Sequence, residues 1–106
     1  MAPLKGFQKR FLRGLAHSLK PVVFVGQKGV TDALANAMND ALDRHELVKV
    51  KFVEFKAKEQ KLAVVAQIEQ SATCATVGLV GHTAIFFRQQ NDPEKRKIIL
   101  PQRAND

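Results

Sequence analysis

The stretch VVFVGQKGVTDAL, residues 22–34, constrains the fold more than any other part of this 106-residue chain. Four consecutive apolar residues, 22–25, lead into two glycines, and a helical pattern of apolar residues leads out. An apolar run bounded by turn signals predicts a strand that is buried on both faces or lies in the middle of a sheet. Thr31 is a favourable N-cap for the helix that follows. The stretch therefore predicts a strand, a glycine turn and a helix in direct succession.

The flanking segments extend this unit into a small α/β domain. Apolar residues at three- and four-residue steps predict a helix over roughly 3–17, with lysines and arginines on its other face. After the second helix, alternation around 48–52 predicts a strand with one solvated face. A third helix is predicted over 56–71, and its buried side is made up of Leu62, Val65, Ile68 and Ala72. Two short strands joined at Gly81 and His82 follow, and IILP at 98–101 is a candidate edge strand.

The predicted order of elements is α-β-α-β-α-β-β. A strand–helix–strand unit with a right-handed crossover makes neighbouring strands parallel, whereas the last two strands form an antiparallel hairpin. We therefore expect an α/β fold, a small two-layer domain with a four-stranded mixed sheet. The chain length favours one domain over residues 1–106, with its core at about 4–101.

Positive charge is concentrated in the first third of the chain. The net charge is +7, six lysines and arginines precede the first acid, Asp32, and the other eleven nearly balance the ten acids. A localised positive field attracts a polyanion, which leaves nucleic acid, an anionic membrane surface and an acidic protein as candidates. The N-terminus carries charges where a signal peptide needs an apolar region, and no apolar run reaches membrane-spanning length. We therefore expect a cytoplasmic protein without membrane attachment.

The glycine turn has two interpretations. It is a tight turn, or it is a cradle for a phosphate, because Gly26 and Gly29 let the backbone approach an anion at a helix N-terminus. Lys28 adds a cation there, and Gln27 adds hydrogen-bond donors. The spacing matches neither a nucleotide-binding P-loop nor the dinucleotide fingerprint. A Gly-x-x-Gly loop is how KH domains clamp a nucleic-acid backbone, although the bare pattern is weak and recurs as GLVG at 78–81.

The remaining reactive side chains form no catalytic or metal-binding pattern. The three histidines lack metal-ligand spacing, no carboxylate pair suggests acid–base chemistry, and Cys74 is the only cysteine. We therefore expect no enzyme activity, no cofactor and no bound metal.

Four stretches of the sequence, LRGLAHSLKPVVFVGQKGVTD, HELVKVKF, VGHTAIFFR and RKIILP, together resemble the YhbY family. This family is the bacterial single-domain form of the CRM (chloroplast RNA splicing and ribosome maturation) domain, and the resemblance covers nearly everything from Leu4 to Pro101. It implies RNA binding, a fold similar to the C-terminal domain of bacterial translation initiation factor three, and association with precursors of the large ribosomal subunit. In the family, the loop that falls on Gly26–Gly29 is implicated in RNA contact. The chain departs from the family pattern in the hairpin motif, which reads Phe86-Phe87-Arg88-Gln89 where Leu-Tyr-Arg-Pro is common, and at His82, where a basic residue is common.

We therefore expect a non-enzymatic, monomeric RNA-binding protein that recognises ribosomal RNA of large-subunit precursors by backbone and shape. The chain has seven Phe and neither Trp nor Tyr, so base stacking is poorly provided for. The candidate RNA-binding residues are Gly26, Gln27, Lys28, Gly29, Lys5, Lys9, Arg13, Lys20 and Arg88. Two alternatives remain open: a module that docks on acidic ribosomal or assembly-factor surfaces with incidental RNA contact, and a general DNA-binding protein.

Overall fold

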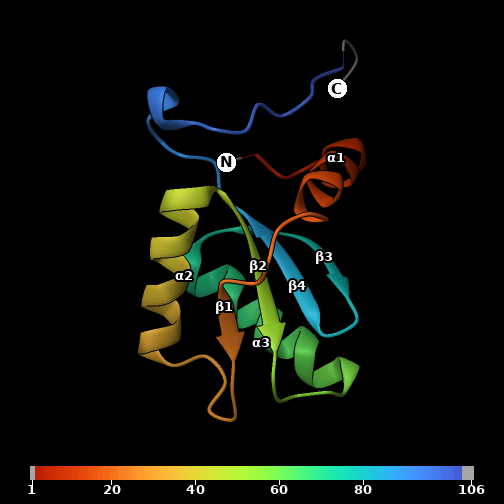
Figure 1. Ribbon diagram of the computed structural model, residues 1–106, viewed down its shortest axis with the longest axis vertical. Helices are drawn as coiled ribbons and strands as arrows, with labels where there is room; N and C mark the ends of the chain where they lie inside the picture. Colours follow the sequence, from red (N-terminus) through yellow and green to blue (C-terminus); the bar gives the residue numbers. More distant parts are fainter. Residues whose placement is uncertain (1, 104–106) are drawn as a thin grey trace.

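A four-stranded mixed sheet lies at the centre of the computed structural model, which describes residues 2–103 (Figure 1). The strand order is β1-β2-β4-β3, with β1 parallel to β2 and the other neighbours antiparallel. The strands are β1 (Val23–Val25), β2 (Leu47–Phe52), β3 (Ala75–Val80) and β4 (Thr83–Phe87). The helices are α1 (Gly6–Ala16), α2 (Asp32–His45) and α3 (Lys58–Ala72), and a 3-10 turn follows at Pro93–Lys95. The predicted α-β-α-β-α-β-β order and four-stranded mixed sheet are therefore confirmed.

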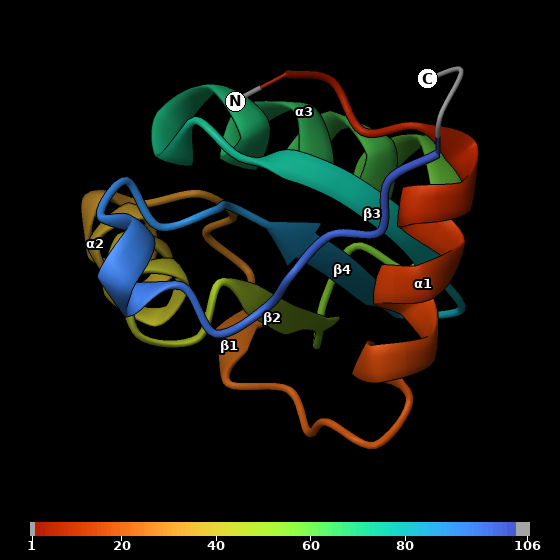
Figure 2. The same ribbon diagram turned by 90° about the horizontal axis from the view of Figure 1, so that it is seen from above.

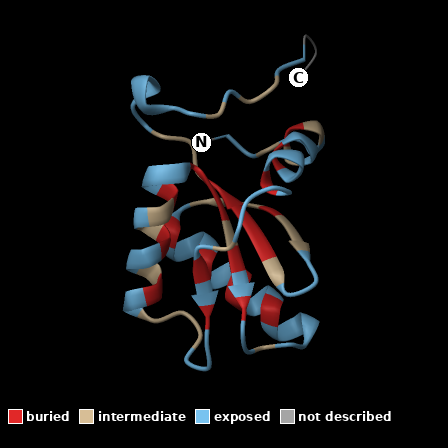
Figure 3. Ribbon diagram, viewed as in Figure 1, coloured by how far each residue is buried: buried red, intermediate tan, exposed pale blue. Residues whose placement is uncertain are grey.

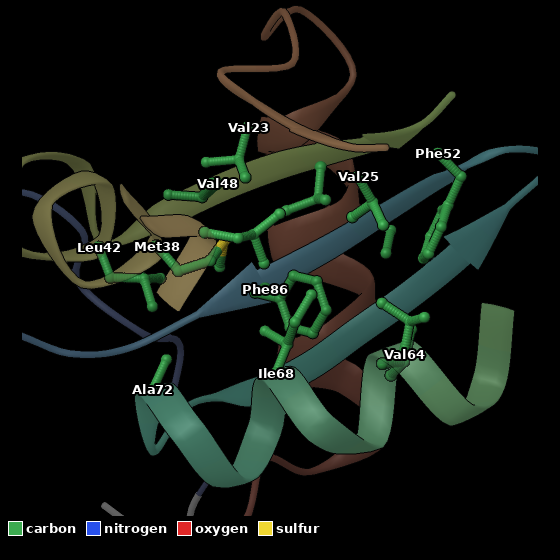
Figure 4. Packing of buried hydrophobic residues seen from close by; sticks show 14 residues of the cluster. Val23, Val25, Met38, Leu42, Val48, Phe52, Val64, Ile68, Ala72 and Phe86 are labelled. Atoms are coloured by element: carbon green, nitrogen blue, oxygen red, sulfur yellow. The ribbon is translucent and has the colours of Figure 1, made fainter. Parts of the chain in front are cut away.

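Helices α2 and α3 cover one face of the sheet and enclose the larger part of the core (Figure 4). Four-residue spacing places Leu34, Met38 and Leu42 in one buried stripe of α2 against the strands. Ile68 of α3 and Phe86 of β4 are fully buried in the same cluster. Complete burial of one such side chain contributes about 1.5–3 kcal/mol, so this layer is a major source of the stability of the domain.

Helix α1 lies against the opposite face of the sheet, near one end of the strands (Figure 2). Leu12 and Ala16 pack against Leu47 and Phe87, which are register partners in β2 and β4. The sheet and the α2–α3 pair form the two predicted layers, and α1 adds a partial third layer. Because α1 covers only part of this face, the face stays open over β1, where Phe24 is 55% exposed.

Strand β1 differs from its prediction. It is an edge strand whose one sheet neighbour among the described residues is β2, so the prediction of a strand buried on both faces or in the middle of the sheet is wrong. Val23 and Val25 point into the core, whereas Val22 and Phe24 are more than half exposed. A continuous run of apolar residues predicts a strand, but it does not show whether helices cover both faces of that strand or one.

Two helices also differ in detail from their predictions. Helix α1 begins at Gly6 rather than near residue 3, because Lys5 is extended and its amide donates to Gln8 Oε1 at 2.9 Å. Helix α3 forms as predicted, but Leu62 is exposed and Val64 belongs to the buried side instead. Among residues 2–103, no helix has the length and apolar character needed to cross a lipid bilayer.

The C-terminal segment forms no strand at 98–101 within the described residues, so that prediction is wrong. A buried carboxylate holds the segment instead. Glu46, which ends α2 with a φ of 62°, accepts hydrogen bonds from the amides of Gln90 at 2.8 Å, Lys97 at 2.7 Å and Ile98 at 3.0 Å. These bonds satisfy a charge that would otherwise be costly to bury.

Candidate nucleic-acid interface

Three chain connections meet at one end of the sheet, at the bottom of Figure 1. Val25 pairs with Phe52 where β1 and β2 end, and the Phe52 amide donates to the carbonyl oxygen of His82 at 2.8 Å. The register therefore places the β1–α2, β2–α3 and β3–β4 connections next to one another. We call this region the loop end, and it consists of residues 26–31, 53–57 and 81–82.

The β1–α2 connection is a tight turn with a glycine at each end. The Gly29 amide donates to the Gly26 carbonyl oxygen at 3.1 Å, and Gly29 has a φ of 68°. Gly26 has no such requirement, because an added Cβ would meet nothing within 4 Å. Gln27 and Lys28 occupy the two central positions and are exposed (Figure 3). The turn therefore presents an amide and an ammonium group to solvent without depending on a ligand to fold.

The N-terminus of α2 is less favourable for an anion than the sequence indicates. Thr31 is the N-cap as predicted, and its Oγ1 accepts the Leu34 amide at 3.1 Å. Asp32 then places a carboxylate on the first residue of the helix, where it offsets the partial positive charge of the helix end. Attraction for a phosphate must therefore come from the turn itself and from its neighbours.

A shallow groove of about 380 Å³ lies between this turn and α3. Lys28 and Gly29 line it from the turn, and Gln60 and Gln67 line it from α3. Phe55 contributes a half-buried ring. The ammonium group and the two amide side chains all donate hydrogen bonds, which suits phosphate and ribose oxygens.

Lysines of β2, of the β2–α3 connection and of α3 add positive charge at the hairpin tip of the loop end. Lys61 Nζ donates to the Gly81 carbonyl oxygen at 2.6 Å and lies 3.2 Å from His82 Nδ1. The charge of Lys61 lowers the pKa of His82 below its ordinary 6.5, with smaller contributions from burial and from the charges of Lys56 and Lys51. Three cations acting on one exposed imidazole show that the hairpin tip lies in a positive field.

The basic residues of α1 lie at the other end of the molecule. Helix α1 packs beside Leu47 and Phe87, which are far along β2 and β4 from the loop end (Figure 1). Lys5 and Lys9 therefore do not join the Gly26–Gly29 turn in one surface. They form a second basic surface on a molecule that measures 43 Å along its longest axis.

Arg13 and Lys20 complete the predicted N-terminal set. Arg13 Nη1 donates to the carbonyl oxygen of Val77 at 3.1 Å, and its Cδ lies 3.2 Å from where a Cβ on Gly78 would be. Arg13 therefore holds α1 against β3. Lys20 is exposed in the connection between α1 and β1, away from the turn.

Arg88 is half-buried and bonds to groups of the protein itself. Its Nη1 donates to Asn39 Oδ1 at 2.7 Å and to the Ala72 carbonyl oxygen at 2.5 Å. Its Nη2 donates to the Asn39 carbonyl oxygen at 3.1 Å and to Asp43 Oδ1 at 2.9 Å. The guanidinium thus joins α2 to the end of α3, and these contacts give a role in RNA contact no structural support.

Sequence reasoning overlooked Lys56 and Lys61 as members of the candidate site, and it treated Lys51 equally as part of a solvated strand face. The available signal was five lysines between residues 49 and 61. Only the sheet register shows that Lys51 and Lys56 lie near the same end of the sheet as the glycine turn, whereas Lys49 lies farther along β2 and donates to the Leu19 carbonyl oxygen. Across residues 2–103, no group of three or more His, Cys, Asp or Glu side chains is placed to hold a metal ion.

Comparison with known proteins gives consistent matches. A sequence model described as the CRS1 / YhbY (CRM) domain matches residues 4–88. A Haemophilus influenzae protein named "RNA-binding protein" is 38% identical over 103 residues, which cover 97% of this chain and 100% of that protein. The Bacillus subtilis protein named "Probable RNA-binding protein YqeI" is 34% identical over 98 residues, covering 92% of this chain and 99% of its own length.

The fold also matches a solved structure. The solution structure of SAV1595 from Staphylococcus aureus superposes with a TM-score of 0.79 at 26% sequence identity. The superposition covers 92% of this chain and 99% of that one. The arrangement of helices and sheet described above is therefore shared with a protein of nearly the same extent.

Proposed function

This chain belongs to the CRS1 / YhbY (CRM) domain family, and we propose that it is a non-enzymatic RNA-binding protein whose loop end contacts the RNA backbone. The observation that carries the proposal is the sheet register. It brings the β1–α2 connection, with the exposed Gln27 and Lys28, to the same end of the sheet as the hairpin tip, where the charges of Lys51, Lys56 and Lys61 act on His82. Two relatives that match nearly this whole chain carry names as RNA-binding proteins, which supports the same activity here.

The recognition we propose is of phosphates and shape rather than of bases. Lysines are point charges that attract phosphates without reading sequence. The ring at the loop end, Phe55, is half-buried, which leaves little aromatic surface for stacking an unpaired base. Such binding weakens steeply as salt rises, because each neutralised phosphate releases counterions.

We further propose that the RNA is ribosomal RNA in precursors of the large subunit and that the protein acts there as a monomer in the cytoplasm. Resemblance to the YhbY family supports this process. The basic surface formed by Lys5 and Lys9 extends the contact as a second set of phosphate ligands, whereas Lys20 lies apart from it in the α1–β1 connection. Arg13 and Arg88 are left out of the proposed contact because their guanidinium groups bond within the protein.

Sedimentation in a sucrose gradient tests the proposal. A tagged wild-type chain is compared with a Gln27→Glu, Lys28→Glu variant and with a Lys95→Glu, Gln102→Glu control, which makes the same charge change at exposed positions outside the loop end. We expect the wild type and the control to sediment with large-subunit precursors and the loop variant to stay in the free-protein fractions. Circular dichroism of each purified variant shows whether it is folded.

The docking alternative gives a different result in the same gradient. A module that binds acidic ribosomal proteins would remain associated with particles after mild nuclease treatment, whereas an RNA-backbone contact would be released. Displacement by duplex DNA as readily as by ribosomal RNA would instead favour a general DNA-binding protein. A wild type that stays in the free-protein fractions would contradict the ribosomal part of the proposal.

A further inference from the structure

An apolar groove lies on the open face of the sheet, apart from the loop end. It has a volume of about 430 Å³ and lies between α1, the α1–β1 connection, β2 and the C-terminal segment. Its apolar lining includes Leu15, Leu19, Val22, Leu47 and Ile98. Pockets of this volume with a mainly apolar lining are the usual form of a binding site.

The apolar side chains of this groove are unusually accessible. Leu15 is 41% exposed, Leu19 is 40% exposed and Val22 is 51% exposed. The three come from one continuous stretch of chain that wraps over the face left open by α1, and nothing among residues 2–103 covers them. Exposed apolar side chains that lie together in one patch mark an interaction site more often than exposed apolar side chains scattered over the surface do.

The charged residues around the apolar groove are all basic. Lys20, Lys49, Lys97 and His45 line it, and no aspartate or glutamate does. Two of the lysines are held in place, since Lys49 Nζ donates to the Leu19 carbonyl oxygen at 3.0 Å and Lys97 Nζ donates to the Arg44 carbonyl oxygen at 2.8 Å. Each ammonium group has three donors, so both retain donors for an incoming acceptor.

We propose that this groove binds a short segment of another protein that presents aliphatic side chains flanked by aspartates or glutamates. The aliphatic side chains fill the groove, and the carboxylates meet Lys20, Lys49 and Lys97. The charge complementarity favours an acidic segment. The lining contains no Phe, Tyr, Trp or Arg, and the imidazole of His45 is its one flat side chain, so the groove offers little surface for stacking an RNA base. The surface lies away from the glycine turn, so the two contacts are compatible in one molecule.

Site-specific photocrosslinking tests this proposal. A benzoylphenylalanine replaces Leu19 in one variant and Leu62 in the matched control, which is 48% exposed on α3 and does not line the groove. The full-length variants are expressed in cells that naturally contain the chain, and the crosslinked peptides are identified by mass spectrometry. We expect an adduct at position 19, and not at 62, whose peptide contains Leu, Ile, Val or Met next to Asp or Glu.

The identified peptide is then synthesised and its Kd is measured with the purified chain. Leu19→Glu should weaken binding at least 10-fold, whereas Leu62→Glu should leave it unchanged. Lys20→Glu should also weaken binding, and a peptide with the facing acid changed to lysine should restore it. No adduct at 19, an adduct with RNA, equal adducts at both positions, or a Kd insensitive to Leu19→Glu would each overturn the proposal.

Discussion

Lys61 Nζ lies 3.2 Å from His82 Nδ1 and donates at the same time to the carbonyl oxygen of the preceding glycine. One ammonium group therefore contacts both residues at the tip of the β3–β4 hairpin, and its charge lowers the pKa of the neighbouring imidazole. Lys61 itself is buried, so its charge acts on His82 with less solvent screening than an exposed lysine would. The Lys61 ammonium group therefore both stabilises the hairpin tip and affects the titration of His82 at the loop end.

Replacement of Lys61 by methionine should raise the pKa of His82 towards its ordinary 6.5, because the largest cause of the lowering is removed. An NMR titration of the His82 ring measures this directly. Lys58→Met is the matched control on the same helix, since Lys58 is exposed and does not act on His82, and it should leave the pKa unchanged. Equal effects of the two variants would contradict the proposed pairing.

RNA binding should strengthen as the pH falls from 7.5 to 5.5. Lysine charges lower the pKa of His82 in the free protein, and a phosphate at the loop end would oppose them and raise it, so binding takes up a proton. The Kd measured at the two pH values checks this. His82→Asn should abolish the His82 part of the dependence, whereas His45→Gln, away from the loop end, should preserve it. The stability of the free protein has the opposite pH dependence. Because folding lowers the pKa of His82, the folded state becomes less stable as the pH falls below 6.5.

Substitutions of the two glycines of the turn should affect different properties: the stability of the protein at Gly29 and RNA binding at Gly26. Gly29→Ala forces an alanine to a φ of 68° and should lower the free energy of unfolding by about 1–2 kcal/mol. Gly26→Ala meets no strain and no contact, so it should leave stability unchanged but weaken RNA binding if the backbone there approaches a phosphate. Urea denaturation and a filter-binding assay measure the two quantities. Unchanged RNA affinity in Gly26→Ala would mean that the glycine serves no close approach.

Lys28→Ala should reduce RNA affinity and lower the dependence of log K on log salt by about 1, the amount expected for one lost phosphate contact. Its melting temperature should not change, because Lys28 is exposed at the centre of a turn. Lys95→Ala, exposed in the 3-10 turn, is the control and should keep the wild-type salt dependence. An unchanged slope for Lys28→Ala would remove this lysine from the contact.

Arg88→Met should destabilise the protein by about 2–3 kcal/mol, because Asn39 Oδ1 and the carbonyl oxygen of the buried Ala72 lose their donor. Asp43→Asn should cost less than about 1 kcal/mol, because that carboxylate is largely exposed. Urea denaturation measures both. RNA affinity of folded Arg88→Met should equal that of the wild type, and a selective loss of affinity would restore Arg88 to the site.

The Cys74 thiol should react slowly in the native protein. Burial raises its pKa to about 11, and the nearby Arg88 charge offsets only part of that effect. Iodoacetamide at pH 8 should therefore modify Cys74 much faster in urea than in buffer, since the thiolate is the reactive form. Because the pKa is raised on folding, this group favours the folded state fully below pH 9 and less as the pH rises towards 11.

Local patterns in the sequence were sufficient for most of the fold. Alternation of Val48, Val50 and Phe52 with lysines predicts β2, and Thr31 with its side-chain cap predicts the start of α2, and both are confirmed. These features depend on neighbours within a few residues. The exposure of Phe24 depends on where α1 packs against the sheet. Contacts between distant parts of the chain determine this position, so the local sequence pattern does not predict it.

The candidate site was harder to predict for the same reason. The glycine turn is local and its residues predict it, whereas its position at the same end of the sheet as Lys61 and His82 arises from the register of the strands. Arg88 shows how distant partners escape a sequence pattern. Its position in a family motif suggested a ligand contact, but its partners Asn39 and Asp43 lie more than 40 residues away and hold it within the protein.

The Glu46 carboxylate has a consequence for how the chain is made. Its donors are amides of residues 90, 97 and 98, so they leave the ribosome long after Glu46 has emerged. During synthesis the sheet strands can pair first, while this charge remains hydrated. We expect the C-terminal segment to dock after them, because a chain cut short before residue 97 would have to bury an acid with two of its three donors missing.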